Sequence, residues 1–128
     1  MKTISLLSIF LVFQITGFSQ WTTTQLSEAK ERVASITFGD EIFFVGGAKG
    51  NSGPGTSKVE IYHTLKDEWE ITDMPSYSAA DLKVTKTNEY ALFYGGTYSL
   101  VGKLVIYNHK ERSWEVINHP NHRFDYAV

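Results

Sequence analysis

The sequence predicts an all-β protein, and three observations support this fold class. Phe, Trp and Tyr make up 14% of the 128 residues, and short apolar runs alternate with turn residues. No stretch of the mature sequence keeps the 3.6-residue period of a long amphipathic helix. Two apolar runs, EIFFVGG at residues 41–47 and YALFYGG at 90–96, end in a glycine pair and lie 49 residues apart. Each is typical of a buried strand whose end needs positive φ or a close backbone approach.

A second pair of matching segments shows that the chain contains a repeat. KVEIYHTLKDEWEI at residues 58–71 matches KLVIYNHKERSWEV at residues 103–116, with a displacement of 45 residues. The displacement of the glycine pairs is larger by four because AKGNSGPGTS, at 48–57, is longer than TYSLVG, at 97–102. An insertion confined to one loop is what a repeat architecture tolerates.

Each repeat unit contains four predicted strands. They cover residues 33–38, 41–45, 59–63 and 68–72 in the first unit, and 82–86, 90–94, 104–108 and 113–117 in the second. Gly39-Asp40 and Asn88-Glu89 are predicted to form two-residue hairpin turns. Four antiparallel strands per 45–50 residues is the pattern of a β-propeller blade. We therefore expect two four-stranded antiparallel blades, at about residues 30–74 and 79–119.

The same residues resemble the kelch-repeat family of β-propellers. In that family a hydrophobic second strand ends in Gly-Gly, the third strand carries a tyrosine, and a tryptophan follows. The matching residues are Gly46, Gly47, Tyr62 and Trp69 in the first unit, and Gly95, Gly96, Tyr107 and Trp114 in the second. The resemblance implies structural roles, since glycines permit sharp turns and aromatic rings pack between adjacent sheets. The second unit departs from the family pattern where Asp81 stands in the place of Arg32.

Partial units flank the two complete ones. Trp21 lies 48 residues before Trp69 and is interpreted as the end of a preceding unit, and HRFDYAV at residues 122–128 as the start of a third. Closed propellers have about four to eight blades. The two complete units are therefore expected to belong to a partial propeller, with either missing downstream blades or self-assembly of several copies.

The first nineteen residues are predicted to be a signal peptide, with residues 20–128 as the mature domain. Lys2 precedes a mostly apolar segment at residues 4–15, and Gly17 and Ser19 stand at the positions that a signal peptidase reads. The segment is too short for a comfortable bilayer span, so we expect no membrane span after cleavage. The chain has no cysteine. These features predict a secreted or periplasmic protein, of bacterial type, that uses no disulfide.

Composition and motifs exclude several functions. Acidic residues outnumber basic ones by fourteen to twelve, which gives no basic face for nucleic acid. His119 and His122 are near enough in sequence to share a metal, but no carboxylate or cysteine accompanies them at ligand spacing, so they are interpreted as turn residues. The charged residues at 40–41, 67–68 and 110–112 are interpreted as solvated turn charges. No catalytic residue, metal or cofactor is predicted.

The predicted function is recognition of a protein or glycan partner. In a meander, the loops between second and third strands and those between units lie at one end of the sheets, and such loops commonly bind ligands. The candidate binding residues are Lys49, Asn51, Ser52, Tyr77, Tyr98, Asn118, His119 and His122. The alternative is a fragment of a kelch-propeller carbohydrate-active enzyme, similar to sialic-acid epimerases or galactose oxidase. The copper site of such oxidases needs a cysteine, which this chain lacks.

Overall fold

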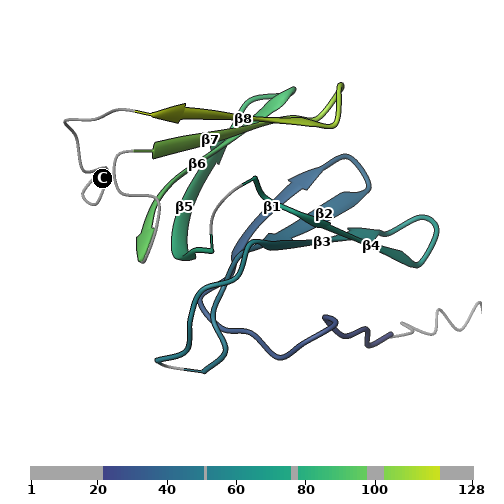
Figure 1. The fold of residues 1–128 in the computed structure, drawn as a ribbon. Coiled ribbons are helices and arrows are strands. Elements are labelled where there is room, and N and C mark those ends of the chain that lie inside the picture. The colour runs from purple at the N-terminus through teal and green to yellow at the C-terminus, as the bar shows by residue number, and fades with distance from the viewer. Residues whose placement is uncertain (1–21, 51, 76–77, 98–102, 119–128) are drawn as a thin grey trace, which may run out of the picture.

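The chain folds into two four-stranded antiparallel sheets, and the all-β prediction is confirmed (Figure 1). A computed structural model describes residues 22–50, 52–75, 78–97 and 103–118. Sheet 1 contains β1 (Ala34–Phe38), β2 (Glu41–Val45), β3 (Lys58–His63) and β4 (Glu68–Asp73). Sheet 2 contains β5 (Ala80–Lys86), β6 (Tyr90–Thr97), β7 (Lys103–Asn108) and β8 (Ser113–Asn118). The described residues include no helix, and hence none long and apolar enough to cross a membrane.

Both sheets are simple meanders in which each strand pairs with the next along the chain. The turns at Gly39-Asp40 and Asn88-Glu89 are found as predicted, since Phe38 pairs with Glu41 and Thr87 N donates to Tyr90 O at 2.8 Å. Most strand ends fall within one or two residues of the prediction. The exception is β6, which continues to Thr97 because its glycine pair stays in the ladder with β5.

Strand alternation gives each sheet two different faces. In sheet 1 the inner face carries side chains that are completely or almost completely buried: Phe43, Val45, Val59 and Ile61. The other face of sheet 1 carries Tyr62 and Trp69, and we call it the aromatic face. The corresponding aromatic face of sheet 2, with Tyr107 and Trp114, packs on the inner face of sheet 1. Two ring contacts show this packing, because the Tyr107 ring lies 5.2 Å from Phe43 and 6.4 Å from Phe38, centroid to centroid.

The two units also match in backbone conformation. Among the described residues, four other than glycine have positive φ, and they form two pairs of equivalent positions: Arg32 (58°) with Asp81 (60°), and Asp67 (56°) with Arg112 (51°). Asp81, which replaces the arginine of the family pattern in the second unit, makes a contact between the units. Arg32 Nη1 donates a hydrogen bond to Asp81 Oδ2 at 3.0 Å. A residue other than glycine rarely takes this conformation, so its recurrence at matched positions confirms that the repeat is structural.

The first glycine pair lies where the end of β2 approaches the segment that enters β5. Gly46 and Gly47 have φ of 68° and 98°, and Gly95 and Gly96 have φ of 68° and 89°, as the sequence predicts. Gly47 N donates to Ala79 O at 2.9 Å, which ties the end of β2 to the segment that enters β5. A Cβ on Gly46 would lie 2.4 Å from the same carbonyl oxygen. The pair therefore satisfies both parts of the expectation, positive φ and a close backbone approach.

Candidate functional site

The loop between β2 and β3 is joined to the connection between β4 and β5 at one end of the sheets. We call this the loop end; it is on the left in Figure 1, opposite the β1–β2, β3–β4 and β7–β8 hairpins. Ala48 bridges to Gly55, and Thr56 bridges to Ala79. Met74 N donates to Ser57 O at 2.8 Å, and Thr56 N to Gly47 O at 2.9 Å. These bridges and hydrogen bonds fix the base of the β2–β3 loop.

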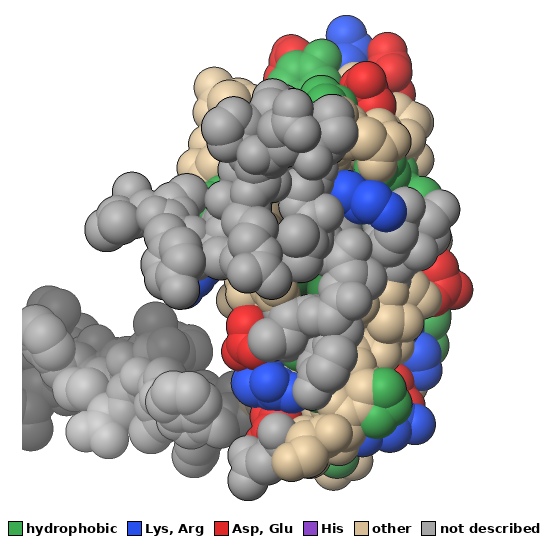
Figure 2. Space-filling model, turned by 60° about the vertical axis from the view of Figure 1, so that its left-hand side comes forward, with side chains coloured by type: hydrophobic (Ala, Val, Ile, Leu, Met, Phe, Trp, Pro, Cys, Tyr) green, Lys and Arg blue, Asp and Glu red, His purple; other side chains and the backbone are tan. Residues whose placement is uncertain are grey.

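The described candidate binding residues all lie at the loop end and are exposed. Lys49 and Ser52 are in the β2–β3 loop, and Asn118 ends β8. The Lys49 ammonium pairs with Glu28 Oε2 at 2.8 Å. Asn51, Tyr77, Tyr98, His119 and His122 lie outside the described residues. Figure 2, in which this end is turned forward, shows acidic and basic side chains interspersed on the described surface.

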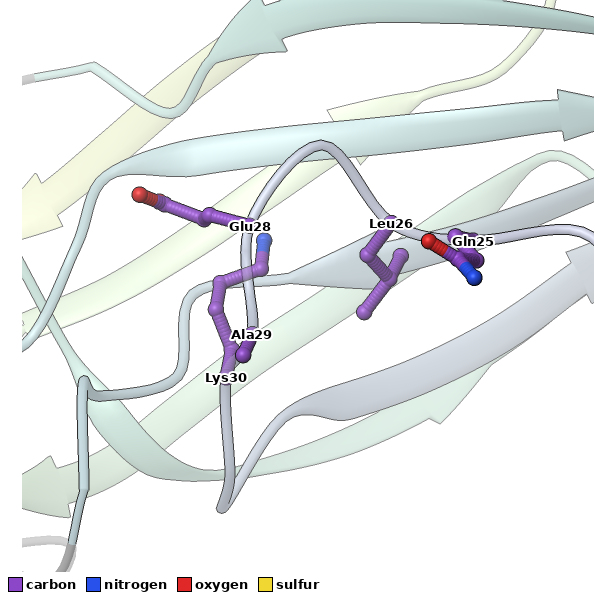
Figure 3. Close-up of a pocket in the computed structure, with 5 residues that line it drawn as sticks. All are labelled: Gln25, Leu26, Glu28, Ala29 and Lys30. Atoms are coloured by element: carbon purple, nitrogen blue, oxygen red, sulfur yellow. The ribbon is translucent and has the colours of Figure 1, made fainter.

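The segment before β1 lies against the aromatic face of sheet 1. Thr24 Oγ1 accepts a hydrogen bond of 2.7 Å from the Trp69 indole. Between Gln25 and Lys30 the segment arches over a shallow hollow of about 340 Å³, and the described residues that line this hollow all belong to the segment itself (Figure 3). The hollow therefore has no converging groups from the sheets that would fix the orientation of a ligand.

A buried ion pair joins this segment to the middle of β3. Lys30 Nζ lies 2.7 Å from Glu60 Oε1, and the two side chains are 0% and 1% exposed. The Ser27 amide donates to the other carboxylate oxygen at 2.6 Å. Burial alone would raise the pKa of Glu60, but the bonds from Lys30 and Ser27 outweigh it, so this pKa lies below its ordinary value. No sequence motif pointed to this pair.

We expect the protein to lose stability in acid because of Glu60 and Glu70. Both carboxylates have a pKa below the ordinary value of 4.5, although burial opposes the shift. Lys30 and Ser27 lower the pKa of Glu60. Arg112 and His63 lower the pKa of Glu70. A depressed folded-state pKa stabilises the protein above the unfolded value, and this contribution is lost as pH falls through the folded one. The urea midpoint should therefore be steady from pH 7 to 5 and fall from pH 5 to 3. In Glu60→Gln the midpoint should be lower at pH 7 and the acid decline shallower; parallel profiles would contradict the role of Glu60.

A cluster of charged side chains crosses between the sheets at the opposite end, which we call the hairpin end. Arg112, in the β7–β8 turn, donates from Nη1 to Glu41 Oε1 at 2.9 Å and from Nη2 to Glu70 Oε2 at 2.6 Å. His63 lies 3.3 Å from each of these two carboxylate oxygens. His109 stacks on Phe38 with the ring centroids 4.5 Å apart, and its Nδ1 is 3.5 Å from Glu41 Oε2. Glu41, His63, Glu70, His109 and Arg112 form this hairpin cluster.

The hairpin cluster corrects part of the charge interpretation. Glu41 and Arg112 were expected to be solvated turn charges, but Glu41 is only 9% exposed and Arg112 bonds to two carboxylates of the other sheet. The reason is that β2 begins at Glu41 on the inner face, where sheet 2 covers it. The cluster stabilises the contact between the two sheets, because each acidic group faces a guanidinium or an imidazole.

The motif aromatics pack in the same way within each unit. The Tyr62 and Trp69 rings lie 5.0 Å apart, and the Tyr107 and Trp114 rings 4.6 Å apart. The Tyr62 hydroxyl donates to Asp67 Oδ1 at 2.6 Å. In sheet 2 the pair lies between the sheets, and Tyr107 is buried. These contacts are those of core packing.

Residues 22–50, 52–75, 78–97 and 103–118 contain no group of three or more His, Asp or Glu side chains placed to hold a metal ion. Comparison with models of known protein families gives no match, and comparison with curated proteins gives none either. The fold thus defines the class of protein as an all-β chain of two stacked, repeated four-stranded antiparallel sheets.

Proposed function

We propose that the chain is a secreted kelch-type module of a β-propeller that recognises a protein or glycan partner through its loop end. The observation that carries this proposal is the Thr56–Ala79 bridge, which joins a loop of unit 1 to the connection between the units. Two connecting segments thereby share one fixed base, and their exposed residues include Lys49 and Ser52. Rigidly supported loops of this kind lose little conformational entropy on binding.

The kelch-type part of the proposal is supported by the way the sheets stack. The inner face of sheet 1 meets the aromatic face of sheet 2, so the units follow each other in one direction rather than facing each other symmetrically. Repetition of that step generates an arc of sheets, as in a propeller. The motif tyrosine and tryptophan of unit 2 lie in this interface.

The experiment compares variants at the two ends of the sheets. The purified mature chain is applied to an array of oligosaccharides and extracellular protein domains, and the strongest hit is titrated. We expect Lys49→Ala/Ser52→Ala to weaken binding at least tenfold, because both exposed side chains lie on the proposed surface. The control is Lys66→Ala, an exposed lysine in the β3–β4 turn at the hairpin end, which should bind as the parent does. Equal binding by the loop variant and the parent would contradict the proposal.

A further inference from the structure

The inner face of sheet 1 is buried, but the equivalent face of sheet 2 is open to solvent. We call this the outer face of sheet 2; its apolar side chains are Tyr90, Leu92, Tyr94, Leu104, Ile106 and Ile117. None of them is buried, and Tyr90 and Ile117 are 39% and 41% exposed. Four of these side chains have repeat equivalents in sheet 1 that are at most 1% exposed. The equivalent pairs are Leu92 and Phe43, Tyr94 and Val45, Leu104 and Val59, and Ile106 and Ile61. The outer face therefore has the apolar character of a surface that another layer covers.

The interface between the two sheets shows what covers such a face. The inner face of sheet 1 receives the aromatic face of sheet 2, and at the hairpin end it receives Arg112 between Glu41 and Glu70. The outer face of sheet 2 has a hollow of about 270 Å³ at the corresponding place, lined by Tyr90, Ile106, Asn108, Glu111, Ser113 and Glu115. Glu115 is the repeat equivalent of Glu70, one of the two carboxylates that bind Arg112. The acidic partner of the arginine is thus repeated in an open hollow.

We propose that the outer face of sheet 2 docks a further four-stranded antiparallel sheet that presents a Tyr–Trp face and carries an arginine at the position of Arg112. In that complex the arginine enters the hollow and pairs with Glu115. This inference rests on the contacts between the two sheets and is independent of what the loop end binds. An arginine matches the hollow because Glu111 and Glu115 both line it.

Sheet 1 of a second copy is a poor occupant of this face, for two reasons. Its hairpin carries Asp67 where Arg112 would be needed, and Asp67 would face Glu111 and Glu115 across the interface. Its aromatic face is also occupied by the segment before β1, through the contacts of Trp69 with Thr24 and of Glu60 with Lys30. In sheet 2 the equivalent of Glu60 is Val105, which is fully buried between the sheets. The aromatic face of sheet 1 is therefore suited to contact with the segment before β1 and not with another sheet.

The test supplies a further layer to the intact chain. Residues 79–118 are appended after Val128 through a Gly/Ser linker, so that a third sheet with the required aromatic face and arginine is present in the same molecule. We expect the amides of β8 in the host chain to exchange at least tenfold more slowly than in the parent, and the urea midpoint to rise. Unchanged exchange in β8 would overturn the proposal.

A charge swap tests the predicted ion pair separately from general stability. In the tandem protein, host Glu115→Arg should remove most of the gain in protection, and changing the appended arginine to glutamate as well should restore it. In the parent chain, Glu115→Arg should leave the urea midpoint unchanged, since Glu115 is exposed there. Full protection in the Glu115→Arg tandem would refute the pair. A discrete oligomer of the parent in light scattering would show that a second copy occupies the face, and would also refute the proposal.

Discussion

Replacement of Lys30 by methionine is expected to lower the free energy of unfolding by about 3–5 kcal/mol. Lys30 and Glu60 form an ion pair of 2.7 Å with no more than 1% of either side chain exposed. Methionine fills a similar volume but leaves the Glu60 carboxylate buried without a cation, with Ser27 as its remaining hydrogen-bond partner among the described residues. Removal of one partner from a buried pair is costly because the remaining charge is desolvated without compensation. Urea unfolding at pH 7, followed by tryptophan fluorescence, measures the loss.

Two further variants separate the ion pair from general damage. Lys30→Met/Glu60→Leu removes both charges and should recover most of the stability, since apolar pairs often replace buried ion pairs without loss. Lys58→Met changes a neighbouring lysine whose pair with Glu28, at 3.4 Å, is partly exposed, and should cost at most about 1 kcal/mol. The deficit of Lys30→Met should also shrink as pH falls, because Glu60 without its lysine has a raised pKa and protonation relieves the buried charge. A Lys30→Met protein as stable as Lys58→Met would disprove this account.

The sequence predicts the strands well because their signals are local. Alternation in β1, apolar runs in β2 and β6, and turn residues at Gly39 and Asn88 each depend on a few neighbouring residues. The glycine pairs were also predictable, since only glycine combines positive φ with a close backbone approach. The repeat then placed the remaining strands by analogy between the units.

The hairpin cluster could not be predicted in the same way. Arg112 and Glu41 are 71 residues apart and belong to different units, so no local pattern links them. A signal does exist in the differences between the units: where the first has Thr64 and Asp67, the second has His109 and Arg112. Basic groups thus appear in the unit whose hairpin faces Glu41 and Glu70. In a stacked repeat, positions that differ between units are candidates for contacts across the interface.

The buried pair had a comparable signal. Glu60 lies between the apolar residues Val59 and Ile61 in the middle of a strand, where its repeat equivalent is Val105. A carboxylate at such a position needs a cation if it is covered, and Lys30 precedes the strand by 28 residues. Spacing alone does not show that the segment around Lys30 folds back over sheet 1, so the partner could be identified only from the structure.

Replacement of Gly46 by alanine is expected to destabilise the protein by about 2–5 kcal/mol. Its φ of 68° costs an L-residue about 1–2 kcal/mol, and the added Cβ costs about 1–3 kcal/mol more through overpacking. The overpacking arises because the Cβ would lie 2.4 Å from Ala79 O, the carbonyl that accepts the Gly47 amide. Relief of the clash therefore requires the two sheets to move apart at the point where β2 meets the start of β5. Urea unfolding measures the total loss of stability in Gly46→Ala.

Gly39 provides a matched control for the backbone part of this effect. It also has positive φ, 57°, but nothing lies within 4 Å of the place its Cβ would occupy. Gly39→Ala should therefore cost only about 1–2 kcal/mol, and the difference between the two variants measures the close approach of the sheets. Gly46→Ala should also speed amide exchange at Gly47, whose N–H bonds to Ala79 O, while Gly39→Ala leaves that exchange unchanged. Equal losses for the two variants would show that positive φ alone explains the glycine pair and that the contact with Ala79 contributes nothing.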